Sequence, residues 1–395
     1  MICRSEVLIG AMFPPSLDLP CPWLHPFPEI LESPTMSSSK TAKLGHWTAY
    51  MPILALVALG VAAFLPNAAA LTLCAAALAG AVFSAVHHAE TVAHKVGEPF
   101  GTLVLAVAVT IIEVALIVSV MLSGGPDKAG LARDTVFAAI MIVSTGIVGL
   151  CLLFGGVRHH TQGFHVEGAS AALAVLCALS VLTLVLPNYT NSVVGPGLTA
   201  SQLAFEGVIS LVLYMVFVFV QTVSHRDYFL AKAPSEEVHV PPPSRRTAVL
   251  SLGLLVVALV AVVGLAKKLS PAVEQAVATA GAPKAVVGIV IAALVLLPEG
   301  LAALRAARAN KLQTSLNLAL GSALASIGLT IPTVAAVSLV LDQQIELGLA
   351  PKETVLLAIT LLVSVLTLGT GRTTVLQGAV HLVLFAAFLF LAIVP

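Results

Sequence analysis

The chain of 395 residues is 58% hydrophobic and only 10% charged, and its mean hydropathy is +1.04. Soluble globular proteins are about 45–50% apolar and about 25% charged, so the composition excludes a soluble enzyme, a disordered chain, a collagen and a coiled coil, and it predicts an all-α polytopic membrane protein. The 19 basic and 19 acidic residues give a net charge of zero, which argues against a nucleic-acid-binding surface.

The N-terminal segment, residues 1–47, differs in composition from the rest of the chain. Seven prolines lie among its first 35 residues, and they interrupt any periodic pattern. We expect a disordered Pro-rich tail without a fold of its own. Its longest apolar stretch is too short for a secretory signal, and Met36, which precedes three serines and a lysine, is a candidate start of the native chain.

Eleven apolar runs are each long enough to cross a hydrocarbon core of about 30 Å, which takes about 20 residues. The predicted spans are residues 48–66, 68–87, 100–122, 134–157, 167–187, 202–224, 247–266, 284–304, 314–340, 353–371 and 373–394. Lys and Arg favour the cytoplasmic face of a membrane. With the N-terminus inside, they divide 13 to 6 in favour of the cytoplasmic loops. We therefore expect a bacterial inner-membrane protein with a cytoplasmic N-terminus and a periplasmic C-terminus.

The longest hydrophilic connection, residues 225–246, divides the spans into two halves. It contains three consecutive prolines, which is typical of an exposed linker. If the span 48–66 is an additional helix, five spans lie in residues 67–224 and five in residues 247–395. An odd number of crossings in each half reverses the orientation of the second half, and such inverted five-helix repeats are typical of secondary transporters.

Two carboxylates lie deep inside predicted spans. Glu113 has more than eight residues of its span on either side, and Glu299 lies six residues before Arg305. Each occupies the second span of its five-span half. A charged carboxylate at this depth is costly, and no Lys or Arg lies at mid-span to pair with it. We therefore interpret the two residues as a binding site for cations and protons between the halves.

Oxygen-bearing groups accompany both carboxylates. Pro298 has no N–H and frees a backbone carbonyl one turn earlier, near Glu299. The spans that follow carry further oxygen groups at Ser144, Thr145, Asn317, Ser322 and Ser326. Each hydroxyl alone is weak evidence, because hydroxyls in helices often bond to a carbonyl one turn earlier. Oxygen ligands without nearby His or Cys suit Ca2+, Na+ or Mn2+ better than zinc or copper, and the spacing of the five cysteines predicts neither a zinc site nor a disulfide framework.

Two carboxylates can neutralise one divalent cation or bind two protons, because burial disfavours the charged form. If the helices move only when the pair is neutralised, exchange of the cation for protons is obligatory.

A cation channel lined by the same carboxylates is the alternative, and coupled proton movement distinguishes the two. An intramembrane enzyme is disfavoured because the sequence has no HExxH motif and no nucleophile beside a base. We expect no cofactor; the partners are inorganic cations, protons and the lipid bilayer.

Two further groups of polar residues lie near predicted span ends. His87, His88 and His94 flank the cytoplasmic start of the third span, where their titration near neutral pH makes them candidate pH sensors; ordinary solvation at the interface is the alternative. Glu206, one turn into the sixth span, is expected to reach water at the outer face.

Several motifs between Met51 and Pro395 together resemble those of a known family. They are His88-Ala89-Glu90 through Gly97-Glu98-Pro99-Phe100-Gly101, Ile112-Glu113-Val114, Arg133-Asp134-Thr135, Pro298-Glu299-Gly300, Asn317-Leu318 with Gly321-Ser322, and Gly371-Arg372-Thr373. The family is that of the bacterial ChaA-type calcium/proton antiporters, within the Ca2+:cation antiporter superfamily. The resemblance implies two inverted repeats, about residues 100–150 and 286–332.

This resemblance also implies roles for individual residues. Glu113 and Glu299 would take the cation and the protons. Supporting ligands would come from the next helix of each repeat, at Ser322 and Ser326 in the second and at Thr145 in the first, where Met141 stands in place of an expected hydroxyl.

The sequence departs from the broader family in one respect. The Gly-Asn-x-x-Glu pattern is missing before both Glu residues, so the Asn ligands of that pattern are absent. Members close to this subtype are also associated with Na+/H+ and K+/H+ exchange. Ca2+ is therefore the favoured substrate, and Na+ and K+ are further candidates.

Overall fold

The computed structural model describes residues 45–64, 67–97, 100–123, 129–193, 195–230, 243–281, 283 and 285–394. Most of the predicted N-terminal tail and much of the predicted linker therefore lie outside the described residues. Within them the regular secondary structure is helical apart from two strands of two residues each.

The helices follow one another in the order expected from the apolar runs. They are α1 (Gly45–Phe64), α2 (Ala68–Val96), α3 (Phe100–Ser123), α4 (Leu131–Met141), η3 (Ile142–Ile147), α5 (Val148–His159), α6 (Val166–Ser180), η4 (Val181–Val185), η5 (Leu186–Tyr189), α7 (Ala200–Phe219), η6 (Val220–Ser224), η7 (Arg226–Tyr228), α8 (Arg245–Thr279), α9 (Ala285–Arg308), α10 (Leu312–Leu341), α11 (Pro351–Leu368) and α12 (Val375–Ile393). The strands are β1 (Gln162–Gly163) and β2 (Arg372–Thr373). Segments η3, η4 and η6 are π-helical turns that continue the helix before them.

Every predicted span coincides with one helical segment, and the all-α polytopic fold is confirmed. Among the described residues, ten segments are long and apolar enough to cross a membrane, and α3 contributes a shorter described apolar stretch, Ala106–Val118. The predicted ends are less accurate, because α2 continues to Val96 and α8 to Thr279. Both extensions hold several helix-forming residues, such as Ala, Glu and Lys, so the helix continues beyond the apolar run.

The helices of the two predicted halves pack in matching pairs. Helix α2, the first of one half, packs along α8, the first of the other. The second helix of each half packs on the third of the other, so α3 contacts α10 and α9 contacts α4 and α5. The fifth helices follow the same rule, because α7 packs on α10 and α12 on α5. This reciprocal pattern is the one expected of two related five-helix repeats.

Two short backbone pairings connect the halves in the same reciprocal manner. Strand β1, between the third and fourth helices of the first half, pairs antiparallel with β2, between the fourth and fifth helices of the second. The counterpart is an antiparallel bridge between Gly197 and Glu346, in which the halves exchange roles. Both pairings satisfy backbone groups in connections that contain few regular hydrogen bonds.

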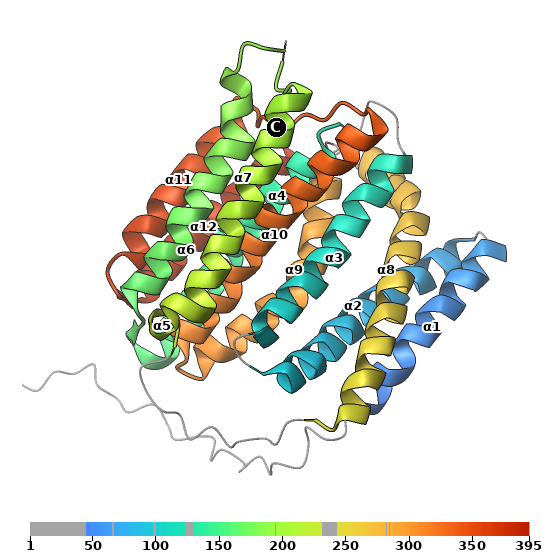
Figure 1. The fold of residues 1–395 in the computed structure, drawn as a ribbon, viewed down its shortest axis with the longest axis horizontal. Helices are drawn as coiled ribbons and strands as arrows, with labels where there is room; N and C mark the ends of the chain where they lie inside the picture. Colours follow the sequence, from blue (N-terminus) through green and yellow to red (C-terminus); the bar gives the residue numbers. More distant parts are fainter. Residues whose placement is uncertain are drawn as a thin grey trace, which may run out of the picture. The chain divides into compact units, whose positions relative to one another are not determined.

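The buried apolar side chains form two clusters. One joins α1, α2 and α8, together with one face of α3. The other is larger and holds α4 to α7 with α9 to α12. Figure 1 shows α1, α2 and α8 grouped on one side of the bundle, with α3 and α9 between them and the other helices. Residues of α3 and α9 contribute to both clusters, so these two helices lie at the boundary between them.

Candidate cation and proton site

The two predicted carboxylates lie on the helices at this boundary. Glu113 belongs to α3 and is 3% exposed, and Glu299 belongs to α9 and is 8% exposed. They are close enough to interact electrostatically. Helix α9 continues through Pro298, whose missing N–H leaves the carbonyl of Leu294 without its helical donor. The fold thus brings together two residues that are 186 positions apart in the sequence.

Helix α10 supplies a hydroxyl to each carboxylate. The Ser326 hydroxyl donates a hydrogen bond to Glu113 Oε1, and the Ser322 hydroxyl donates one to Glu299 Oε2. The two serines are four residues apart and therefore lie on one face of the helix. One face of α10 thus carries the hydroxyls that contact both carboxylates.

The chemistry of this group is that of hard oxygen ligands. Two carboxylates and two hydroxyls can contribute oxygens to a cation such as Ca2+, which takes 6–8 of them in proteins. The same carboxylates can each bind a proton when no cation is present. Within the described residues, no group of three or more His, Cys, Asp or Glu side chains is placed to hold a metal ion.

Two other residues predicted as ligands are engaged elsewhere. The Thr145 hydroxyl donates to the carbonyl of Met141, one turn earlier in the same helix. Asn317 Nδ2 donates to the carbonyl of Phe229 at 2.5 Å, and its Oδ1 accepts from Gln313 Nε2 at 3.0 Å. In this conformation neither side chain contacts Glu113 or Glu299, and both satisfy local structure instead.

The histidines predicted at a span boundary lie within α2. His88 is 4% exposed, and its Nε2 lies 3.1 Å from the carbonyl of Thr48 in α1. His87 is half-buried with its ring packed edge-on against that of His88, and His94 is exposed. Of the three, only His94 is exposed, as the alternative of ordinary solvation at the interface requires. A role of these histidines in pH sensing stays a prediction.

Two contacts between helices in this part of the bundle could not be predicted from the sequence. The π-helical segment η3 contains Ser144, whose carbonyl lies 2.7 Å from Nδ1 of the buried His381 in α12. Tyr214 of α7 packs where α10 has Gly328, and its phenol interacts electrostatically with Glu299. A single Tyr or His in an apolar run does not reveal which helix it will face.

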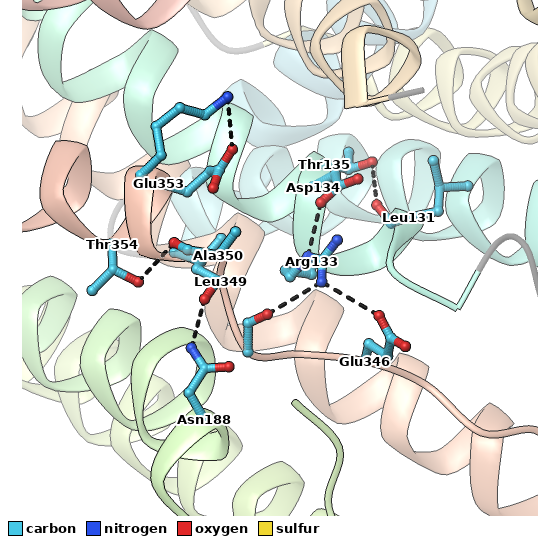
Figure 2. A network of polar contacts seen from close by, with 12 residues as sticks. Leu131, Arg133, Asp134, Thr135, Asn188, Glu346, Leu349, Ala350, Glu353 and Thr354 are labelled. Atoms are coloured by element: carbon cyan, nitrogen blue, oxygen red, sulfur yellow. Dashed lines mark hydrogen bonds and ion pairs between the residues drawn. The ribbon is translucent and has the colours of Figure 1, made fainter. Parts of the chain in front are cut away.

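A polar network joins α4 to the connection between α10 and α11. Arg133 Nε contacts Asp134 Oδ1 at 2.8 Å, and Arg133 Nη1 lies 3.2 Å from the carbonyl of Gly348 and 3.6 Å from Glu346 Oε2. Figure 2 shows Arg133 at the centre of these contacts, with Asn188 bonded to the nearby Leu349 carbonyl. Arg133 of the motif Arg133-Asp134-Thr135 therefore connects the start of α4 to the segment between α10 and α11, and its contacts do not include Glu113 or Glu299.

Comparison with known proteins places this geometry in context. The family model described as sodium/calcium exchanger protein matches residues 66–223 and 250–394. The protein y4hA of Sinorhizobium fredii is named as an ionic transporter. It is 51% identical over 363 residues, covering 90% of this chain and 98% of that protein. The sodium-potassium/proton antiporter ChaA of Escherichia coli is 35% identical over 346 residues, covering 86% and 93%.

A solved structure shows the same architecture at much lower identity. The crystal structure of the H+/Ca2+ exchanger CAX superposes with a TM-score of 0.69 and 15% identity, covering 89% of each chain. This likeness shows a shared fold.

Proposed function

This chain belongs to the sodium/calcium exchanger protein family, and from that premise we propose that it exchanges cytoplasmic Ca2+ for protons, with Na+ and K+ as further candidate substrates. It is a cation exchanger and not an enzyme. The family and the apolar helices also fit a location in the bacterial inner membrane. We propose that the N-terminus is cytoplasmic, because that orientation places most Lys and Arg residues inside.

One observation carries the proposal. Glu113 and Glu299, from different halves of the chain, are both buried and both bonded to serines of α10. A buried pair of carboxylates is stable when its charge is neutralised by a cation or by protons. Since both ligands need the same oxygens, binding of one displaces the other. This competition favours exchange of the cation for protons over passive conduction through a cation channel.

The position of the pair supports a way to couple binding to movement. Helices α3 and α9 lie between the cluster of α1, α2 and α8 and the larger cluster. We propose that these two groups of helices move relative to each other only after the carboxylates are neutralised. Movement with an uncompensated charge would expose that charge to apolar surroundings, at a high free-energy cost.

The identity of the transported cation is supported by the ligand chemistry and by the names of relatives. The oxygen ligands suit Ca2+, Na+ and K+ alike, and the relative ChaA is named for sodium-potassium/proton exchange. Two carboxylates match the charge of one divalent ion, which favours Ca2+. The same pair could bind a monovalent cation together with one proton.

Transport into inverted membrane vesicles tests the proposal. We expect that adding Ca2+ to vesicles with an acidic interior collapses the pH gradient while Ca2+ accumulates inside, in vesicles that contain the protein. Na+, K+ and Mg2+ are tested in parallel. Cation movement that continues at the same rate after the pH gradient is removed, and that moves no protons, would instead identify a channel. Vesicles from cells without the protein provide the control.

A further inference from the structure

Glu206 is a third carboxylate buried within the helix bundle. The sequence predicted that it reaches water, and the structure corrects this, because its side chain is only 6% exposed. Neither of its carboxylate oxygens has a hydrogen-bond partner among the described residues. The next residue, Gly207, has no side chain and lets α10 pack closely against α7 beside Glu206. A side-chain carbon at Gly207 would lie 3.3 Å from Ala335 and 3.5 Å from the backbone of Pro332.

The helices packed against α7 offer no positive charge to Glu206. Helix α10 contains no Asp, Glu, His, Lys, Arg, Tyr or Cys along its whole length. Helix α6 carries Glu167 in its first turn and Cys177 further along, and neither is cationic. A buried carboxyl group without a counter-ion is stable when it carries a proton. Glu206 is therefore suited to bind and release a proton, and not to hold a permanent ion pair.

A cavity at the end of the bundle reaches α7 at Leu203, one helical turn before Glu206. This cavity has a volume of about 750 Å³ and is lined by Met121 of α3, Leu203 of α7, Ser338 of α10 and residues 342–347, which include two further carboxylates. Leu203 precedes Glu206 by one turn on the same buried face of α7. The cavity therefore gives protons a route to within one helical turn of Glu206.

On the other side, the same face of α7 leads to the exchange site. Ser210, one turn after Glu206, is fully buried, and its hydroxyl has no partner among the described residues. Tyr214 follows one turn later, packs against Gly328 and interacts electrostatically with Glu299. The eight residues from Glu206 to Tyr214 span about 12 Å of helix. A carboxyl and two hydroxyls thus stand in a row between the cavity and Glu299.

We infer that Glu206 is a third proton-binding residue, which passes protons between the cavity and Glu299 along the face of α7 that carries Ser210 and Tyr214. In one passage, a carboxylate oxygen of Glu206 takes a proton from hydronium in the cavity and leaves water. That O–H bond then breaks as the proton moves along the hydroxyls and along water molecules that bridge the gap of about 5–6 Å between successive side chains on one helix face. Each hydroxyl or water accepts one proton and releases another. Glu299 gains one proton and Glu206 returns to its starting form. The inference rests on the proposed cation/proton exchange.

Two transport reactions separate this role from a structural one. Purified protein in liposomes is assayed for exchange of a cation against protons, using whichever of Ca2+, Na+ and K+ the wild type exchanges fastest. The same liposomes are assayed for isotopic self-exchange of that cation at equal pH on both sides, which needs no net proton movement. We expect Glu206→Gln to slow the proton-coupled reaction at least tenfold and to leave self-exchange within twofold of the wild type.

Further variants guard against misfolding and general effects. Glu206→Asp keeps a carboxyl group and should restore most of the coupled rate. Ser210→Ala removes one hydroxyl without a change of charge and should slow the coupled reaction about threefold, again without an effect on self-exchange. Glu167→Gln, at an exposed position on α6, is the matched control and should behave as the wild type.

Three results would overturn the inference. Equal loss of both reactions in Glu206→Gln and in Ser210→Ala would indicate a packing role for this face of α7. An unchanged coupled rate in both variants would show that protons reach Glu299 by another route. Wild-type protein that couples none of the three cations to protons would refute the proposed exchange itself, and the role of Glu206 with it.

Discussion

Replacing either Glu113 or Glu299 with Gln is expected to reduce cation/proton exchange more than a hundredfold. Each substitution removes a charge that neutralises the cation and leaves a single buried carboxylate beside an amide. With a cation bound, each carboxylate forms a buried ion pair with that cation, and removal of one partner of such a pair costs about 3–5 kcal/mol. Each 1.4 kcal/mol corresponds to about a factor of ten. The two variants should be similarly impaired, because the two residues occupy equivalent positions in the two halves.

The rate of cation-dependent collapse of a pH gradient in liposomes measures this effect. Glu167→Gln serves as the control, since it removes an exposed carboxylate from α6 at no cost to the site. Glutamine keeps the size of the side chain, so both variants should elute as the wild type does in size-exclusion chromatography. Robust exchange by either variant would be incompatible with the proposed mechanism.

The second large effect is expected at the serines of α10. Ser322→Ala and Ser326→Ala each remove the hydroxyl that contacts one carboxylate. Loss of a group that orients or supplements metal ligands typically reduces affinity about 10–100-fold. We expect the apparent KM for the cation to rise within this range, with a smaller change in the maximal rate, because the charges that drive exchange remain.

A matched control lies in the same helix. Ser315 is also fully buried in α10 but lies two helical turns before Ser322. Ser315→Ala should therefore leave the KM for the cation unchanged. Ser326→Thr keeps the hydroxyl and should retain more affinity than Ser326→Ala. If all three Ala variants raised the KM equally, the effect would come from helix packing and not from contact with the carboxylates.

The sequence showed which residues lie deep within a membrane span, but it did not show which neighbouring helix their side chains face. Runs of about 20 apolar residues mark spans, and a Glu in the middle of such a run stands out whatever surrounds it. Glu113 and Glu299 could therefore be found without a structure. The ends of α2 and α8 could not, because a helix continues into polar sequence as long as its residues favour that conformation.

The side chains that were placed wrongly or left out depend on contacts between helices. A hydroxyl can bond to its own helix or to a neighbour; Thr145 does the former, while Ser322 and Ser326 do the latter. Glu206 lies near the start of its span, where depth alone predicts hydration. Its burial comes from the close approach of α10 at Gly207, which a single sequence does not show.

Proton release on cation binding tests the central claim most directly. Purified protein in weakly buffered detergent solution is titrated with Ca2+ while a pH indicator records free protons, starting at a pH low enough for the carboxylates to be protonated. We predict the release of up to two protons for each Ca2+ bound, a release that declines as the starting pH rises, and none in the double variant Glu113→Gln, Glu299→Gln. Binding of Ca2+ without proton release at every pH would contradict competition for one pair of carboxylates.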